Sequence, residues 1–250
     1  MKNKICVVIA ILIIPIMIFL ADQFLFKETV HVDATFDQSE EWDYINEHQN
    51  EYPSSLLQLA TRNKETIPFV AGYLKESKKT YSMNLKEDLK DGKIPLLLQW
   101  DKRWGYKSYG DDMMAVNGCG PTCLSMVASY LKQDTKLHPY YIARFAIENG
   151  YMTGSSTSWL LMSEGAERLG LNVEELSLDE NQIIDHLKQG HLIICSVSKG
   201  IFTTTGHFIV LREYKDGKIY VNDPNSQEKS HTGYTFEEIQ YQIKNLWVYS

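Results

Sequence analysis

The order of the hydrophobic patterns along the chain is the feature that most constrains its fold. Downstream of residue 118, apolar residues first recur at the spacing of amphipathic helices and then form short runs typical of strands. We expect one helix that begins at residue 119 and three further helices over residues 140–149, 156–169 and 180–188. We expect strands after them, over residues 192–197, 207–214 and 218–222. A group of helices followed by antiparallel strands predicts an α+β domain.

A predicted strand and a predicted loop lie ahead of these helices. Residues 94–100 form a short apolar run that we expect to be a strand. Residues 101–118 contain Gly105, Gly110 and Gly118, and glycines at this density are typical of loops. The domain is therefore expected to cover residues 91–250.

The composition of the 250 residues is that of a globular protein. Hydrophobic residues make up 44% and charged residues 23%, which excludes a disordered chain, a collagen-like chain and a multi-span membrane protein. The 25 basic and 32 acidic residues give a formal net charge of −7 at pH 7. An acidic chain is not attracted to phosphate backbones, so we expect no nucleic-acid partner.

Residues 1–26 have the layout of a signal sequence that stays in the chain as a membrane anchor. Two lysines precede an unbroken apolar run over residues 5–20. A signal peptidase cuts after small residues, and the bulky Phe19, two positions before Ala21, disfavours a cut after Ala21. Basic residues at the start predict that the N-terminus lies inside and the rest of the chain outside. We therefore expect a single-pass protein of the cell membrane, or a secreted one if the segment is cleaved.

Residues 27–90 are expected to be a tether followed by a helical segment. Apolar residues at helical spacing after residue 38 predict short helices that two prolines interrupt. Residues 75–90 are rich in charge and have no apolar face, which is typical of a linker or a solvated surface. This segment has three possible roles: a spacer, a packing element, or a pro-region that covers the active site. A pro-region predicts that trimming the chain before about residue 90 raises activity.

The cysteines indicate a free thiol rather than a disulfide framework. Cys6 lies in the predicted anchor, and three cysteines remain for the exterior domain, an odd number. Cys119 and Cys123 are one helical turn apart, which disfavours a disulfide between them. Cys195 lies within a predicted buried strand, where a small hydrophobic side chain is expected.

Cys119 is the predicted nucleophile. A thiol attacks only as the thiolate, and the free N–H groups at a helix N-terminus stabilise that anion. Gly118 and Gly120 flank the cysteine, and we expect them to let a substrate backbone approach closely.

His207 and Asp223 are the predicted partners of the thiol. His207 opens a predicted strand, where an imidazole is rigid yet accessible and can move the thiol proton. Asp223 follows the next strand and can hold the imidazole in one tautomer.

The turn between these two strands gives a test of the pairing. A two-residue turn at Asp216 and Gly217 with unbroken register puts Asp223 opposite Val210, on the face away from His207. A three-residue loop, or a bulge that shifts the register by one residue, brings both side chains to one face. The triad hypothesis therefore predicts one of these two irregularities.

The oxyanion of the reaction needs hydrogen-bond donors as well. We expect the backbone N–H of Cys119 and the side-chain amide of Gln99 to supply them. A zinc site built from Cys119, Cys123 and His207 lacks the Cys-x-x-Cys or His-x-x-x-His pairs of zinc proteins, so we expect neither metal nor cofactor.

Four stretches together resemble the bacterial papain-like cysteine peptidases. They read LLLQWDKRW at residues 96–104, GCGPTCLSM at 118–126, GHFIVL at 206–211 and VNDP at 221–224. They are similar to the double-glycine, bacteriocin-processing peptidases, the thirty-ninth cysteine-peptidase family, in its stand-alone exported branch. The resemblance covers about residues 92–250.

This resemblance implies a papain-like fold in which an N-terminal catalytic helix packs on an antiparallel sheet. It also implies that Cys119 is the nucleophile, His207 the base and Asp223 the residue that orients the base. A glutamine upstream of the cysteine is the implied oxyanion donor, and Gln99 lies 20 positions before Cys119.

The expected function is that of an exported or membrane-anchored cysteine peptidase that hydrolyses a peptide or protein substrate and contacts the membrane through its N-terminal helix. A cell-wall amidase or a transglutaminase-type acyltransferase is an alternative with the same triad. A papain-like domain that only binds a partner is a third reading, and thiol labelling separates it from the two enzymes.

Overall fold

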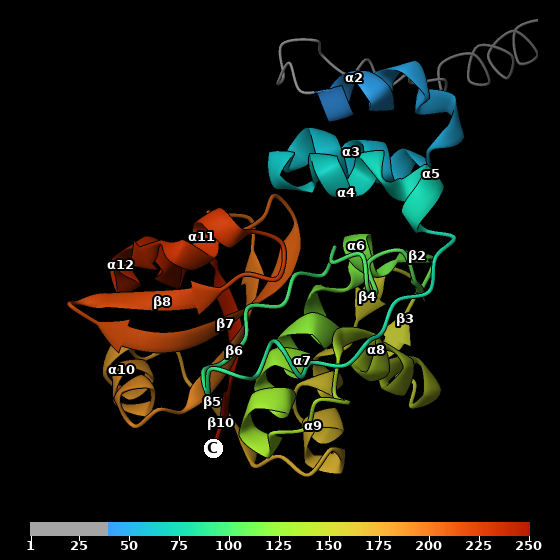
Figure 1. Ribbon diagram of the computed structural model, residues 1–250. Helices are drawn as coiled ribbons and strands as arrows, with labels where there is room; N and C mark the ends of the chain where they lie inside the picture. The colour runs from blue at the N-terminus through green and yellow to red at the C-terminus, as the bar shows by residue number, and fades with distance from the viewer. Residues whose placement is uncertain (1–39) are drawn as a thin grey trace, which may run out of the picture. The chain divides into compact units, whose positions relative to one another are not determined.

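The computed structural model describes residues 40–250, in which helices lie on both faces of a six-stranded antiparallel sheet (Figure 1). The predicted anchor over residues 1–26 lies outside the described residues and stays a prediction. Within residues 40–250, none of the helices combines the length and the apolar character that a membrane span requires.

The helices predicted after residue 38 are present. They are α2 (Glu40–Glu47), α3 (Ser54–Arg62), α4 (Ile67–Ala71) and α5 (Tyr73–Glu76), with 3₁₀ turns at Gln49–Glu51 and Lys64–Thr66. The two prolines lie at helix starts: Pro53 is the N-cap of α3 and Pro68 lies in the first turn of α4, where a proline costs no hydrogen bond. The inward face of α3 buries Leu56, Leu57 and Ala60.

The strand predicted over residues 94–100 is absent. The segment is extended, but side chains and a loop, not a neighbouring strand, bond its backbone. The carbonyl of Pro95 accepts the Asn222 side-chain amide at 3.0 Å, and the Leu97 N–H faces the sulfur of Met126 at 3.4 Å. The apolar run correctly indicated that the segment is partly buried. It carried no information on whether the segment pairs with a neighbouring strand.

The predicted helix at Cys119 is α7 (Cys119–Lys132), with Pro121 in its first turn. Helix α7 packs against α8 (Pro139–Glu148) and against the sheet, and its residues from Gly120 to Ser129 are buried. Ahead of it, the predicted loop contains a two-stranded ribbon, β1 (Ser108–Tyr109) and β2 (Asp112–Met113), and the short helix α6 (Met114–Asn117).

The helix predicted over residues 156–169 is wrong in its first half. Residues there form the hairpin β3 (Met152–Thr153) and β4 (Ser156–Thr157), a 3₁₀ turn at Trp159–Leu161, and then α9 (Glu164–Arg168). Gly154 turns the hairpin with φ of +58°, and the Tyr109 hydroxyl contacts the Thr157 hydroxyl at 2.9 Å. This contact between distant residues stabilises the hairpin, so the serine- and threonine-rich stretch does not become part of the helix.

The sheet has the strand order β5-β10-β6-β7-β8-β9. Strands β6 (Leu192–Ser198), β7 (Gly206–Lys215) and β8 (Lys218–Asn222) and helix α10 (Glu180–Lys188) follow the sequence prediction. The structure also contains elements that the sequence did not predict: β5 (Val173–Leu176), β9 (Gly233–Tyr234), β10 (Ile243–Tyr249) and the short helices α11 (Gln227–His231) and α12 (Phe236–Ile239).

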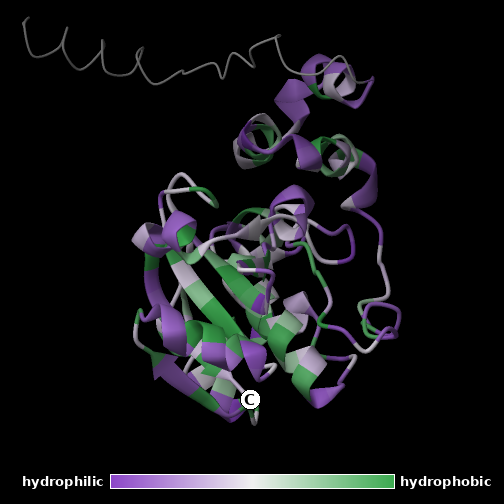
Figure 2. Ribbon diagram, turned by 90° about the vertical axis from the view of Figure 1, so that its left-hand side faces the viewer, coloured by the Kyte–Doolittle hydropathy of each residue, from purple (hydrophilic) through white to green (hydrophobic). Residues whose placement is uncertain are grey.

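Both faces of the central strands are buried. Ile194 and Val210 join the cluster on the side of α7 and α8, whereas their neighbours Ile193 and Ile209 join the cluster on the side of α10 and α12. Figure 2 shows this as hydrophobic residues along the central strands and mostly hydrophilic residues on the outer helices. The sheet is therefore a rigid support for residues at its strand ends.

Candidate active site

Cys119 is the accessible thiol of the described chain. It is half-buried, whereas Cys123 and Cys195 are fully buried, and all three are free. Burial raises the pKa of the Cys123 thiol well above its ordinary value, and burial does the same for Cys195. Both are therefore neutral packing residues, and Cys119 is the thiol that a substrate can reach.

The glycines that flank Cys119 serve packing rather than substrate access. A Cβ on Gly118 would lie 2.4 Å from the Met114 carbonyl oxygen, and one on Gly120 would lie 2.8 Å from the Thr157 methyl group. The expectation that these glycines admit a substrate backbone is thus replaced by a tight fit between the start of α7, α6 and the β3–β4 hairpin.

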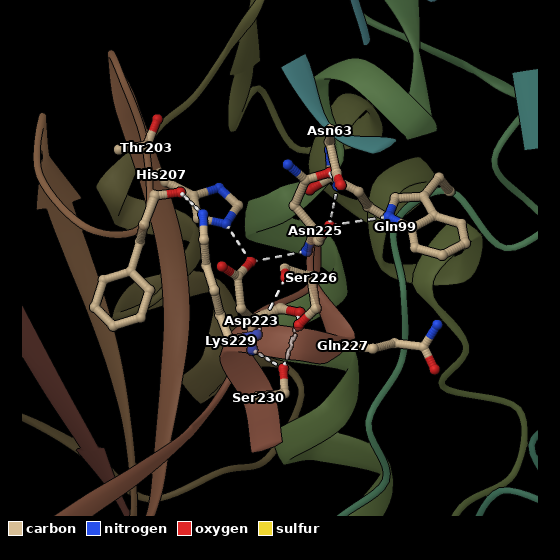
Figure 3. A network of polar contacts seen from close by, with 12 residues as sticks. Asn63, Gln99, Thr203, His207, Asp223, Asn225, Ser226, Gln227, Lys229 and Ser230 are labelled. Atoms are coloured by element: carbon tan, nitrogen blue, oxygen red, sulfur yellow. Dashed lines mark hydrogen bonds and ion pairs between the residues drawn. The ribbon is translucent and has the colours of Figure 1, made fainter. Parts of the chain in front are cut away.

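His207 lies at the start of β7 and is 8% exposed. Its Nε2 and the Oδ1 of Asp223 are 2.7 Å apart (Figure 3). Burial by itself would lower the pKa of His207, but attraction and hydrogen bonding to the Asp223 carboxylate, and then contact with the Cys119 side chain, raise it to about 10. The imidazole is therefore held in its charged form at neutral pH, and its Nδ1 takes no part in the bond to Asp223.

The register of the β7–β8 hairpin explains how the pair meets. Asp216 and Gly217 have φ of 52° and 76°, and Lys215 pairs with Lys218, so the turn has two residues.

The predicted bulge then shifts the register by one residue, because Glu213 pairs with Tyr220 whereas Leu211 pairs with Val221. Arg212 is the extra residue. Beyond it, Val210 faces Asn222, which brings Asp223 to the side of His207.

Asp223 is fully buried just beyond β8. Its Oδ1 also accepts the backbone N–H of Asn225 at 2.8 Å, and its own N–H donates to the Ser230 hydroxyl at 2.9 Å. The carboxylate is thus aimed at His207 by its own loop.

Gln99 lies beside the nucleophile, but its amide is engaged. Its Nε2 donates to the carbonyls of Ala115 at 2.7 Å and of Val116 at 3.3 Å, in the last turn before α7. Gln99 is 3% exposed and lines the same cavity as Cys119 and His207. An oxyanion role therefore requires the amide to release one of these carbonyls.

The cavity at Cys119 and His207 has a volume of about 500 Å³. Residues 200–206 form one wall, and Asn225, Ser226, Glu228 and Lys229 form another. A third wall comes from the helical segment: its lining residues are Ser55, Gln58, Leu59, Arg62, Asn63, Lys64 and Glu65. No sequence pattern indicated this wall, because the polar face of α3 has the pattern of any solvated helix face.

A half-buried thiol at a helix N-terminus beside a buried histidine–aspartate pair is the arrangement of a cysteine peptidase. Residues 92–249 match the Peptidase_C39 like family, and the chain belongs to that family. The resemblance read from the four sequence stretches is therefore confirmed.

Two solved structures are similar to this chain. The peptidase domain of Streptococcus ComA, a bifunctional ABC transporter involved in a quorum-sensing pathway, is 20% identical over 53% of this chain and 89% of that chain, with a TM-score of 0.43. A C39-like peptidase from Bacillus anthracis is 13% identical over 64% of this chain and 95% of that chain, with a TM-score of 0.44. A comparison with curated proteins finds no match.

Proposed function

We propose that this protein is a cysteine peptidase that hydrolyses peptide bonds through Cys119, His207 and Asp223. The observation that carries the proposal is the 2.7 Å contact between the buried His207 and Asp223, at the edge of a cavity that an accessible thiol lines. Family membership supplies the reaction class, because the family is one of peptidases.

The reaction starts from the Cys119 thiolate beside the His207 imidazolium. The thiolate sulfur attacks the carbonyl carbon of the peptide bond and forms a tetrahedral oxyanion. His207 gives its proton to the leaving nitrogen as the C–N bond breaks, which leaves a thioester on Cys119. Water then attacks the thioester and passes a proton to His207. The C–S bond breaks, and the thiolate–imidazolium pair is restored.

Asp223 keeps His207 ready for both proton transfers. Its carboxylate bonds Nε2 and so fixes the ring with Nδ1 toward the thiol. The backbone N–H of Cys119 is one donor for the oxyanion, and Gln99 becomes the second when its amide turns from Val116 toward the substrate.

The substrate is a peptide or protein that reaches the domain outside the cell. This part of the proposal is supported by the two lysines and the apolar run over residues 5–20. Labelling intact cells with a thiol reagent that does not cross membranes tests it. Cys119 should be labelled without lysis, and labelling only after lysis contradicts an exterior domain.

The pH dependence of Cys119 alkylation tests the catalytic proposal. With the full chain in detergent, iodoacetamide should modify Cys119 well below the free-thiol pKa of about 8.5. His207→Ala should move the modification to that value, whereas His48→Ala, a histidine outside the cavity, should leave it unchanged. Labelling that rises only near the free-thiol pKa in the wild type contradicts the proposal and favours a binding domain. Activity on muropeptides but not on peptides points to the amidase instead.

A further inference from the structure

In the loop after Asp223, each of three successive peptide groups is held by its own hydrogen bonds (Figure 3). In the first group, the Pro224 carbonyl accepts the backbone N–H of Gln99 at 2.7 Å. The N–H of the same group, on Asn225, donates to the Asp223 carboxylate at 2.8 Å. The peptide that bonds the carboxylate is therefore itself held from its other side.

The second peptide group is held by two donors from distant parts of the chain. The Asn225 carbonyl accepts Nδ2 of Asn63 at 2.5 Å and the indole N–H of Trp100 at 3.1 Å. The N–H of this group, on Ser226, donates back to the Asp223 carbonyl at 3.2 Å.

The third peptide group is held by Glu65. The Glu65 carboxylate accepts the backbone N–H of Gln227 at 2.8 Å and also the hydroxyl of Ser226, 161 positions away. These donors form the start of α11, where a negative charge is favoured. Asn63 and Glu65 brace each other, because Asn63 Oδ1 accepts the Glu65 N–H at 3.1 Å.

We propose that the Asn63–Glu65 turn of the N-terminal helical segment is a positioning element of the active site: it holds the loop that carries Asp223 in register with His207. This inference rests on the proposed function. Asn63 and Glu65 touch no reacting atom in this role and act through Asn225, Ser226 and Gln227.

In this role the helical segment supports the active site and is not a pro-region that covers it. A pro-region that blocks the cavity raises activity when it is lost, whereas the Asn63–Glu65 turn bonds the Asp223 loop from outside. Loss of the turn leaves the Asn225 carbonyl with only the Trp100 indole as a donor and frees the Gln227 N–H, so the loop holds the Asp223 carboxylate less firmly. The segment is therefore needed for activity.

Substitutions in the full chain test the role. Asn63→Ala and Glu65→Ala should each lower kcat about tenfold, the effect of one well-placed hydrogen bond, with a smaller change in KM. They should also lower the reactivity of Cys119 toward iodoacetamide at low pH, because a loosened Asp223 supports the His207 imidazolium that pairs with the thiolate less firmly. Glu65→Gln keeps an acceptor and should recover most of the activity.

Matched controls come from the same helical segment. Asn50→Ala and Glu47→Ala change exposed residues away from the cavity and should leave both the alkylation profile and kcat unchanged. If Asn63→Ala fails to fold, Trp100→Phe removes only the indole donor to Asn225 and should shift the profile in the same direction by less.

The outcomes separate this proposal from the proposed function. A wild type without low-pH alkylation overturns the catalytic function itself. A wild type with low-pH alkylation, together with folded Asn63, Glu65 and Trp100 variants that keep the wild-type profile, overturns only the positioning role. Higher activity in the Asn63→Ala and Glu65→Ala variants also overturns it and supports the pro-region.

Discussion

Cys119 and Asp223 lie on two sides of His207, and the chain holds them by different means. Cys119 takes its place from the start of α7, where Gly118 packs on its sequence neighbour Met114, and where Thr157 of the β3–β4 hairpin packs on Gly120. Asp223 takes its place from a bulge in β7 and from a loop bonded to residues far away, such as Glu65. The nucleophile is thus mainly a local feature of the sequence, whereas the aspartate is a product of the tertiary structure.

This difference matters because a shift of one residue in the chain affects the two positions differently. A helix N-terminus presents its free N–H groups wherever the helix begins. A strand side chain changes face when the register slips by one residue. The distant contacts and the bulge are therefore what protect the His207–Asp223 pair.

Asp223→Asn gives the largest expected effect on the aspartate side. We expect kcat/KM to fall on the order of 10²- to 10⁴-fold, because the imidazole loses the carboxylate that fixes its tautomer and charge. The pKa of His207, held at about 10, should fall, so the alkaline limit of activity should move to lower pH. A pH–rate profile measures both, and an unmoved alkaline limit contradicts the pairing.

The His207–Asp223 pair should also make the stability of the protein depend on pH. Since the folded pKa of His207 is raised from 6.5 to about 10, the pair stabilises the fold fully below about pH 6.5, and this stabilisation is lost as the pH rises through about 10. Urea unfolding at pH 6 and pH 10 should therefore show a smaller difference in Asp223→Asn than in the wild type.

Insertion of one alanine between Val221 and Asn222 tests the register directly. The inserted residue then faces Val210, and Asp223 moves opposite Phe208, on the face away from His207. Cys119 alkylation should then lose part of its low-pH reactivity, with a fall of about tenfold or more in kcat/KM. Deletion of Arg212 is the control, because it removes the bulge but leaves Leu211 paired with Val221 and Glu213 with Tyr220. If the insertion variant retains the wild-type pH profile, another contact sets the pairing.

Gly120→Ala tests the packing around the start of α7 and has the smallest expected effect on the chemistry. Its added methyl group meets Thr157 at 2.8 Å, so we expect a loss of about 1–3 kcal/mol in the free energy of unfolding. The pH profile of Cys119 alkylation should be preserved, because the helix still begins at the same residue. Thermal unfolding and alkylation together measure this, and a shifted profile at unchanged stability speaks against local control.

The sequence by itself determined the local features of this protein. Helical spacing located α7 with Cys119 at its first turn, and short apolar runs located β6, β7 and β8. Such features follow from side-chain periodicity and from the chemistry of single residues, which neighbours in the chain carry. The order of the motifs was enough to identify the family.

Only the tertiary structure decided the remaining features. It kept residues 94–100 out of the sheet, inserted β10 between β5 and β6, and chose the bulge at Arg212 over a longer turn. It also brought the Asn63–Glu65 turn to the Asp223 loop. These outcomes depend on contacts between residues far apart in the chain, and a local pattern of apolar and polar residues carries no record of which distant partner will satisfy a backbone group.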